Sequence, residues 1–180
     1  EFIQKHKLFS FYSALMVIVV LIAIFAPWLA PGDPFTSNMS QALQAPSSHH
    51  WFGTDKLGRD VLSRVIYGTQ LSLFMGVSIV VIMVSIGTII GAVAGYFGGK
   101  IETILMRLAD IMLSFPGIVL AIAIAGILGG SIVNTIIALS VVGWAKYARL
   151  VRSMTLKVRG EEYVTAAVMM GASTTTILRR

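Results

Sequence analysis

The sequence predicts an all-α protein, a bundle of helices that crosses a membrane several times. Of its 180 residues, 56% are hydrophobic and only 12% are charged, whereas a soluble domain carries roughly 25% charged residues. The mean hydropathy is +0.84, and the charges stand at the edges of long uncharged runs. A soluble globule needs more polar residues to cover its surface. The composition therefore excludes a soluble domain and predicts a polytopic membrane helix bundle.

The same composition excludes several kinds of site. The absence of cysteine removes disulfides, iron–sulfur clusters and thiolate zinc sites. The three histidines include none at metal-ligand spacing within an apolar span, so neither a metal nor a cofactor is predicted. The net charge of +6 is placed where membrane orientation requires it, which indicates lipid and no nucleic acid as the partner.

The first span is predicted at residues 11–29, which contain no charge. A membrane core needs roughly 20 apolar residues of helix. A cleaved signal peptide is the alternative, with Lys5 and Lys7 as its basic start. The run is long for that, and Trp28-Leu29-Ala30 is a poor cleavage site, so the sequence favours an uncleaved anchor.

The second span is predicted at residues 71–97, which are uncharged. Within it Gly87, Gly91 and Gly95 recur every four residues. This spacing places them on one helix face, where another helix can approach closely. The partner helix stays open.

Residues 111–145 form one uncharged run, too long for a single span, that is interrupted by glycines at 129–130. We divide it into spans at 111–128 and 132–151, which makes four transmembrane helices. Pro116 is expected to kink the third, because proline removes a backbone donor and clashes with the preceding turn. Lys146 is expected to snorkel to the interface where the fourth helix leaves the lipid.

The distribution of Lys and Arg predicts the orientation. Of the 14 Lys and Arg residues, only Lys56, Arg59 and Arg64 lie on the side of the membrane opposite to the N-terminus. Because positive residues stay in the cytoplasm, both ends of the chain are predicted to lie inside and residues 31–68 to form an external loop.

The external loop divides into two parts. Residues 31–48 are rich in turn formers and predicted to be irregular. From Arg59 onward, apolar residues recur with helical spacing, which predicts a short amphipathic helix at the outer surface that leads into the second span. Its charges either face water alone or contact a substrate or partner. The adjacent His49 and His50 are expected to be solvated rather than to bind nickel.

Two charged patterns lie on the predicted inner side. Arg107 and Asp110 share a helical face and are expected to pair, with a proton or cation relay at Asp110 as the alternative. Lys146, Arg149 and Arg152 step by three and form a basic stripe, expected to face anionic lipid headgroups.

The segment 152–180 is predicted to form a cytoplasmic helix–turn–helix. Gly160 breaks the chain, Glu161 and Glu162 open a helix at its N-terminal dipole, and Gly171 is placed to end it as a left-handed cap. Residues 174–176 can cap a second helix that begins at Ile177. The first helix has an apolar face that comprises Tyr163, Val164, Ala167 and Val168. Such a shape suits docking in another protein's groove, and an amphipathic helix on the inner leaflet is the alternative.

Two of these segments resemble a known family. Residues 53–64, GTDKLGRDVLSR, resemble the outer-loop signature of permeases in peptide/nickel ABC importers. Ala166-Ala167 followed by Gly171 resembles the cytoplasmic "EAA" loop of binding-protein-dependent permeases. Arg107 and Asp110, together with Ser114-Phe115-Pro116, fit the same subfamily.

The resemblance implies ATP-driven import of di- or oligopeptides, or alternatively of nickel, across the cytoplasmic membrane of a prokaryote. It implies a homologous second permease subunit, two cytoplasmic ATP-binding subunits and an extracytoplasmic solute-binding protein. The chain itself is then a transport subunit and not an enzyme, because a separate subunit hydrolyses ATP. The candidates for contact with the ATPase are Glu161, Glu162, Tyr163, Ala166, Ala167 and Gly171. The candidates for an external partner contact or gate are Asp55, Arg59, Asp60 and Arg64.

Three departures from the family pattern stand out. Thr165 occupies the position of the usual Glu, and Gln70 that of a common Arg. The chain ends at Arg180, before an expected Ile-x-Leu-Pro, so residues 1–180 are interpreted as a permease domain that lacks the last two of six helices.

An ion-coupled secondary transporter is the alternative of a different class. It requires ionisable groups deep in the spans, which 11–29 and 71–97 lack apart from Tyr12. A purely structural anchor would not need the 161–180 segment.

Overall fold

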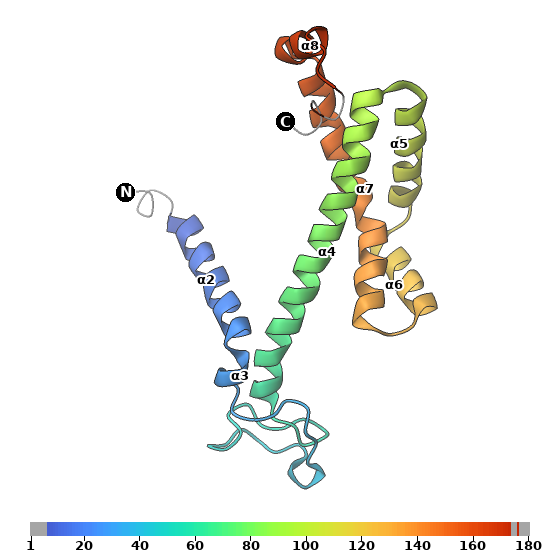
Figure 1. Cartoon of the computed structure of the whole chain (residues 1–180). Helices are drawn as coiled ribbons and strands as arrows, with labels where there is room; N and C mark the ends of the chain where they lie inside the picture. The colour runs from blue at the N-terminus through green and yellow to red at the C-terminus, as the bar shows by residue number, and fades with distance from the viewer. Residues whose placement is uncertain (1–6, 174–175, 177–180) are drawn as a thin grey trace. The chain divides into compact units, whose positions relative to one another are not determined.

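The described part of the chain, residues 7–173 and residue 176 of a computed structural model, is built from helices and loops (Figure 1). The helices in chain order are α2 (Lys7–Ile24), α3 (Ala26–Leu29), the 3-10 helix η1 (Met39–Gln41), α4 (Val61–Phe97), α5 (Gly99–Ser114), α6 (Gly117–Leu128), α7 (Ile132–Arg159) and α8 (Glu162–Met169). The predicted all-α class is confirmed. The chain divides into two compact units, Glu1–Gly76 and Val77–Arg180.

The spans differ in how far the described structure supports them. Among the helices of the described residues, α4 is the one that is long and apolar enough to cross a membrane by itself, and α5 with α6 meets the same criterion as a bent pair. The apolar part of the first helix, Leu8–Ile24, is shorter than the usual length of a span. The count of four spans stays a prediction.

The first predicted span is one helix only in part. Helix α2 ends at Ile24, and the short α3 follows with Pro27 in its first turn. Proline fits a first turn because its missing N–H has no partner there in any helix. The predicted span over 11–29 is therefore made of two helices, with a break at Phe25.

The predicted amphipathic helix and the second span are one continuous helix. Helix α4 runs for 37 residues from Val61, so no separate surface helix precedes the span. The Asp60 carboxylate accepts hydrogen bonds from the backbone N–H and the hydroxyl of Ser63, at 2.7 and 2.8 Å. This is the geometry of a helix N-cap, and it explains why the helix begins at Val61.

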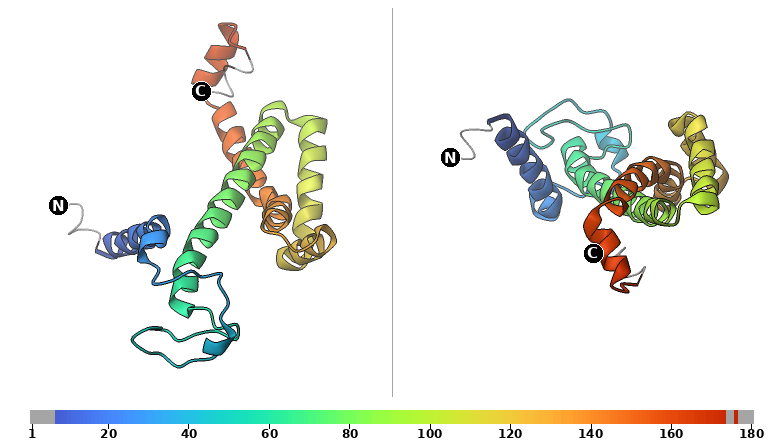
Figure 2. Two further views of the ribbon diagram at one scale, coloured as in Figure 1. Left: turned by 60° about the horizontal axis from the view of Figure 1, so that its bottom comes forward. Right: turned by 90° about the horizontal axis from the view of Figure 1, so that it is seen from above.

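The third predicted span is broken rather than kinked. Helix α5 begins at Gly99 and ends at Ser114, and α6 starts at Gly117 after a bend of 90°. Phe115 is extended, with φ −91° and ψ 145°, because the ring of the following Pro116 disfavours the helical conformation there. Figures 1 and 2 show the resulting corner between α5 and α6.

Helix α7 begins at Ile132, as predicted, where the Ser131 hydroxyl accepts a 3.1 Å hydrogen bond from the backbone N–H of Asn134. It continues without interruption to Arg159, beyond the predicted end of the span at 151, and stops at Gly160. Helix α8 then opens at Glu162, and Gly171 has φ +83°. Both glycine predictions are confirmed, whereas the predicted second helix from Ile177 lies outside the described residues.

The second unit has its core along α7. Three alanines and one tryptophan are buried where α5 and α7 meet, and apolar residues of α4 and α5 pack against them. The buried residues are Ala109, Trp144, Ala145 and Ala148. Alanine at three of these four positions lets the helix backbones approach closely.

The predicted glycine face of α4 is confirmed, and its partner is α7. A Cβ at Gly87 would lie 2.5 Å from the Cβ of Tyr147, and one at Gly95 would lie 2.7 Å from the Cβ of Thr155. Real Cβ atoms do not approach so closely. Only glycine therefore permits this approach of the two helices, which Figure 2 shows from two directions.

Candidate functional site

The first candidate region is the external-loop signature, and Asp55 is its organising residue. Its Oδ1 accepts hydrogen bonds from the backbone N–H groups of Leu57 at 2.8 Å and Arg59 at 3.0 Å. Its Oδ2 accepts a 2.8 Å hydrogen bond from Nε of Arg59. The Arg59 hydrogen bond is the main reason that the pKa of Asp55 falls to about 2. The carboxylate therefore holds the turn closed at physiological pH.

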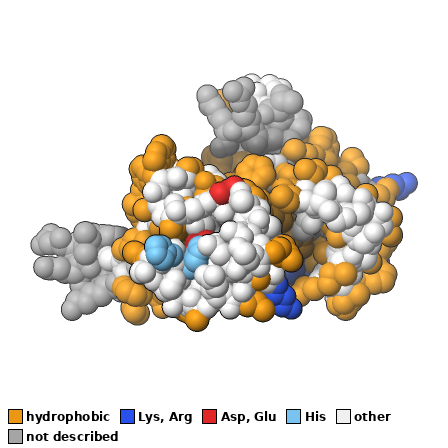
Figure 3. All heavy atoms as spheres, turned by 90° about the horizontal axis from the view of Figure 1, so that it is seen from below, with side chains coloured by type: hydrophobic (Ala, Val, Ile, Leu, Met, Phe, Trp, Pro, Cys, Tyr) orange, Lys and Arg blue, Asp and Glu red, His pale blue; other side chains and the backbone are white. Residues whose placement is uncertain are grey.

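Asp60 organises the other half of the signature. Besides capping α4, its Oδ1 lies 3.0 Å from Nδ1 of His50, and the Asp60 side chain is only 8% exposed. Burial by itself raises the pKa of Asp60, but the hydrogen bonds from Ser63 and His50 together lower it. The prediction that His50 is merely solvated is thus wrong, whereas His49 is exposed. Figure 3 shows histidine beside an acidic side chain on this face.

Two glycines let the signature pack against the first half of the loop. Gly53 has φ +71° and Gly58 has φ +70°, in the left-handed region that favours glycine. A Cβ at Gly58 would overlap the backbone carbonyl of Asn38. The loop half predicted to be irregular is irregular apart from η1, but it is tied to the signature by hydrogen bonds to Leu57 and Thr54.

The structure brings the four predicted outer residues into one neighbourhood. Arg64 places Nε 3.5 Å from Oδ2 of Asp55 and donates a 3.4 Å hydrogen bond from Nη1 to the carbonyl of Pro34. Asp55 thus pairs with both Arg59 and Arg64, whereas Asp60 binds His50 and Ser63. The sequence alone did not indicate these partners. Two aromatic side chains beside them, Trp51 and Phe52, are left 68% and 58% exposed.

The second candidate region is the junction of α5 and α7. Arg149 pairs with Asp110, so the predicted local pair of Asp110 with Arg107 is wrong. Arg152 pairs with Glu102, and its Nε lies 2.7 Å from Oε1 of that residue. Two of the three cations in the predicted basic stripe therefore bind carboxylates of α5 instead of facing lipid headgroups.

Sequence reasoning missed Glu102 altogether. Glu102 and Asp110 are eight residues apart, close to two full turns of an α-helix, so they lie on the same face of α5. Arg149 and Arg152 lie three residues apart on α7, which packs against this face of α5. The spacing of the two carboxylates together with that of the two arginines is the signal for the interhelical pairs.

The third candidate region is α8 with the cap that follows it. Of its side chains only Val164 is buried, and the predicted ATPase-contact residues Glu161, Glu162, Tyr163 and Ala166 are exposed. Met169 and Met170 at its end are 83% and 82% exposed. Gly171 has open space around the position of a Cβ. The predicted residues thus lie in one short helix and its two caps, and of the six only Ala167 is half-buried.

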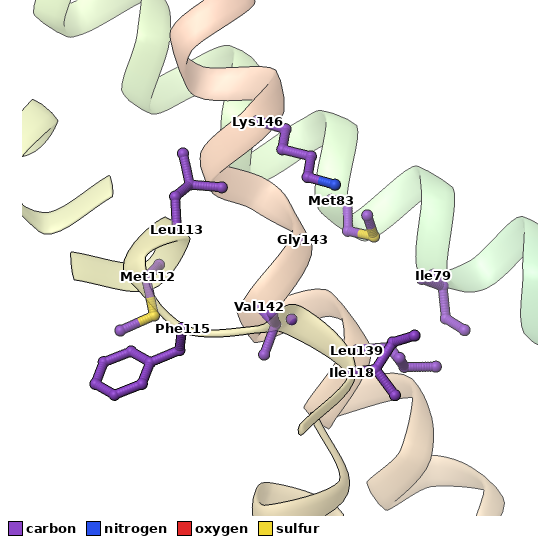
Figure 4. Close-up of a pocket in the computed structure, with 11 residues that line it drawn as sticks. Ile79, Met83, Met112, Leu113, Phe115, Ile118, Leu139, Val142, Gly143 and Lys146 are labelled. Carbon is purple, nitrogen blue, oxygen red and sulfur yellow. The ribbon is translucent and has the colours of Figure 1, made fainter. Parts of the chain in front are cut away.

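A cavity of about 490 Å³ lies in the second unit, beside the corner between α5 and α6 (Figure 4). Its walls come from α4, α5, α6 and α7 and from the α5–α6 break. They are apolar except for Lys146. Within the described ranges, no group of three or more His, Cys, Asp or Glu side chains is placed to hold a metal ion.

Comparison with known families gives two matches. Residues 87–180 match the family described as "binding-protein-dependent transport system inner membrane component". Residues 4–46 match the "N-terminal TM domain of oligopeptide transport permease C". The two matches cover the segments on either side of the outer signature.

Several individual proteins are similar to nearly the whole chain. A dipeptide transport system permease protein of Alkalihalophilus pseudofirmus is 44% identical over 94% of this chain and 56% of its own length. A probable D,D-dipeptide transport system permease protein of Escherichia coli is 44% identical, over 89% of this chain and 54% of its own. An oligopeptide transport system permease protein of Bacillus subtilis is 38% identical over 97% of this chain and 57% of its own length. The chain thus spans little more than half the length of these relatives.

Proposed function

This chain belongs to the family of inner-membrane components of binding-protein-dependent transport systems, and we propose that it serves as permease subunit of an ATP-driven importer of di- or oligopeptides. The names of the relatives described above refer to the transport of dipeptides, D,D-dipeptides and oligopeptides. These names favour a peptide over nickel as the substrate. Membership in this family also favours ATP-driven import over the ion-coupled secondary transporter.

The single observation that carries the proposal is the position of α8 at the end of the long helix α7. Helix α7 runs unbroken from Ile132 to Arg159, and α8 begins at Glu162, after Gly160 and the extended Glu161. Because a helix is stiff along its axis, a displacement at α8 reaches the apolar part of α7 without a hinge inside that helix. The ATP-binding subunits would supply that displacement by docking on α8.

The contacts of α7 distribute this displacement to its neighbours. Gly87, Gly91 and Gly95 of α4 lie directly against α7, so the two backbones cannot approach further. Helix α5 is held to α7 by the Asp110–Arg149 and Glu102–Arg152 pairs. Movement of α7 should therefore carry α4 and α5 with it as one body, the rigid-body type of change common in switching proteins.

The complete importer in this proposal contains further subunits. A homologous second permease completes the pathway, two ATP-binding subunits contact the cytoplasmic α8 helices, and a solute-binding protein delivers the peptide from outside. Both ends of this chain then lie in the cytoplasm, as the distribution of Lys and Arg indicates.

The outer signature would present a rigid surface to the solute-binding protein. Asp55 pairs with Arg59 and Arg64, and Asp60 binds His50 and Ser63. Their role in the proposal is to fix the loop shape, while neighbouring exposed side chains such as Trp51 make the contact.

The experiment tests α8 through its glycine cap, in the complete subunit. Gly171→Arg forces a bulky side chain into the left-handed conformation, which costs roughly 1–2 kcal/mol, and should abolish co-purification with the ATP-binding subunit while membrane insertion is unchanged. Gly171→Asn is the matched control, because asparagine tolerates this conformation, and it should keep the association. Unchanged co-purification of Gly171→Arg would contradict the docking role of α8.

A further inference from the structure

The cavity beside the α5–α6 corner contains one charged group among apolar walls. Its lining includes Met83 of α4, Leu113 of α5, Ile118 of α6 and Leu139 of α7, and Lys146 is the single ionisable residue in it. In Figure 4 the Lys146 side chain extends from α7 toward Met83. A lone ammonium at the edge of an apolar space is an attractive position for an anionic group.

Lys146 differs from the two cations that follow it on the same helix face. Arg149 and Arg152 each pair with a carboxylate of α5. For Lys146, no carboxylate among the described residues lies within ion-pair distance. Leu113, the α5 residue that lines the same cavity, offers it no charge. The ion pairs between α5 and α7 thus involve Arg149 and Arg152 but not Lys146, which lines the cavity.

The position of Lys146 along α7 argues against a lipid headgroup as its partner. It lies 14 residues after Ile132, the first residue of α7, which corresponds to about 21 Å of helix. A hydrocarbon core about 30 Å thick that begins near Ile132 would still surround this position. On this placement Lys146 lies inside the hydrocarbon core, contrary to the expectation that it snorkels to the interface, and we take a transported anion as its partner.

From this geometry we infer that Lys146 receives the terminal carboxylate of the transported peptide, with the surrounding apolar walls accepting its side chains. The inference rests on the proposed peptide import and adds a substrate-contacting residue to it. The cavity volume of about 490 Å³ is within the range of roughly 300–1,000 Å³ typical of small-molecule sites. This volume accommodates a short peptide, and one cation matches its one terminal carboxylate.

The first test measures peptide uptake by the complete importer in proteoliposomes, with radiolabelled alanine di- and tripeptides. Lys146→Met should raise KM or lower uptake about tenfold, the size expected for loss of one charged hydrogen bond. Lys146→Arg keeps the charge and should retain most of the uptake. Lys157→Met removes an exposed cation of the same helix outside the cavity, and should leave uptake unchanged.

The second test locates the carboxylate directly. A water-soluble carbodiimide activates a carboxylate, and the Lys146 amine then displaces the activated group to form an amide and release the urea. The wild-type importer, with the N-acetylated form of the transported peptide, should become labelled in the tryptic segment that contains residue 146. Lys146→Arg, which transports but has no primary amine there, should lose that label.

The outcomes separate three explanations. A wild-type importer that takes up none of the peptides overturns the proposed function. A wild-type importer that transports, with Lys146→Met equal to it, overturns the substrate role of Lys146 alone. A defect of Lys146→Met that appears in vesicles with anionic lipid and vanishes in purely zwitterionic vesicles identifies an anionic lipid headgroup as the partner of Lys146, and also overturns the substrate role.

Discussion

The outer signature and helix α8 carry the two sequence motifs of this chain, and they use their polar side chains in opposite ways. In the signature, the carboxylates of Asp55 and Asp60 bind backbone N–H groups and the neighbouring side chains of Arg59 and His50. In the α8 region, Glu162 and Tyr163 of the helix and its N-cap Glu161 are exposed. The polar residues of the outer signature therefore stabilise the fold of the loop, whereas those of the α8 region form an accessible surface.

This difference decides what a substitution in each region should change. A variant in the signature should alter the stability of the loop first, and any effect on a partner should follow from that. A variant on the surface of α8 should leave the fold unchanged and alter only an association. The following three predictions test this distinction.

The largest effect is expected from Gly58→Ala. Gly58 has φ +70°, and a left-handed conformation costs a residue with a Cβ roughly 1–2 kcal/mol. The new Cβ would also overlap the Asn38 carbonyl. Backbone hydrogen exchange over residues 38–60, measured by mass spectrometry on the subunit in detergent, should accelerate at least about tenfold.

Gly32→Ala is the matched control for this loop variant. Gly32 has no atom within 4 Å of the position of a Cβ and no positive φ. Its exchange should stay at the wild-type rate. Wild-type protection in Gly58→Ala would mean that the loop is not held together at this turn.

An intermediate effect is expected from Met169→Ser on α8. Because Met169 is 83% exposed, its replacement should change the stability of the subunit by less than about 0.5 kcal/mol. Loss of an apolar contact should weaken association with the ATP-binding subunit several-fold, by about 1 kcal/mol. Quantitative co-purification or surface-based binding measurements would detect this change.

Met154→Ser on α7 is the comparison for the α8 variant, since Met154 is also exposed, at 57%. It should bind the ATP-binding subunit as the wild type does. Equal weakening in both variants would show that the docking surface is not confined to α8.

The smallest effect is expected from acidification. The pKa of Asp55 is about 2 in the folded loop, compared with an ordinary value of 3.8. A lowered pKa stabilises the folded loop fully above the unfolded value, and this stabilisation is lost as the pH falls from about 4 toward 2. Proteolytic nicking of residues 53–60 by an acid-stable protease should accelerate over this interval.

Asp55→Asn should remove that pH dependence, because it has no carboxyl group to titrate at this position. If the variant shows the same acid transition as the wild type, another carboxylate controls the loop. Asp60, whose pKa is also lowered, is then the next residue to replace.

The sequence predicted the fold class and the boundaries around α7 and α8, because these depend on local signals, whereas α5 (Gly99–Ser114) was not predicted as a separate helix. Glycine and capping residues determined the ends of α7, the start of α8 and its left-handed cap, all of which the structure confirms. The bend at Pro116 was predicted as a kink, because the sequence shows where a proline disrupts a helix but not how far the next helix turns away.

The pairing of charges was beyond prediction from local spacing. Asp110 has Arg107 one turn earlier, but Arg149, 39 residues away in sequence, pairs with it. His50 likewise finds Asp60 across the loop. Both contacts depend on tertiary packing, as does the glycine face of α4, whose existence was predicted and whose partner α7 was not.

The length of α4 has a consequence for where water meets this protein. Its 37 residues make a rod about 55 Å long, whereas the oily interior of a bilayer is about 30 Å thick. Even a tilt of about 40°, the upper end of what such helices show, leaves more than ten ångströms of the rod outside that interior. Part of α4 therefore lies in the aqueous or headgroup layer. Polar side chains next to that part of the helix stay hydrated.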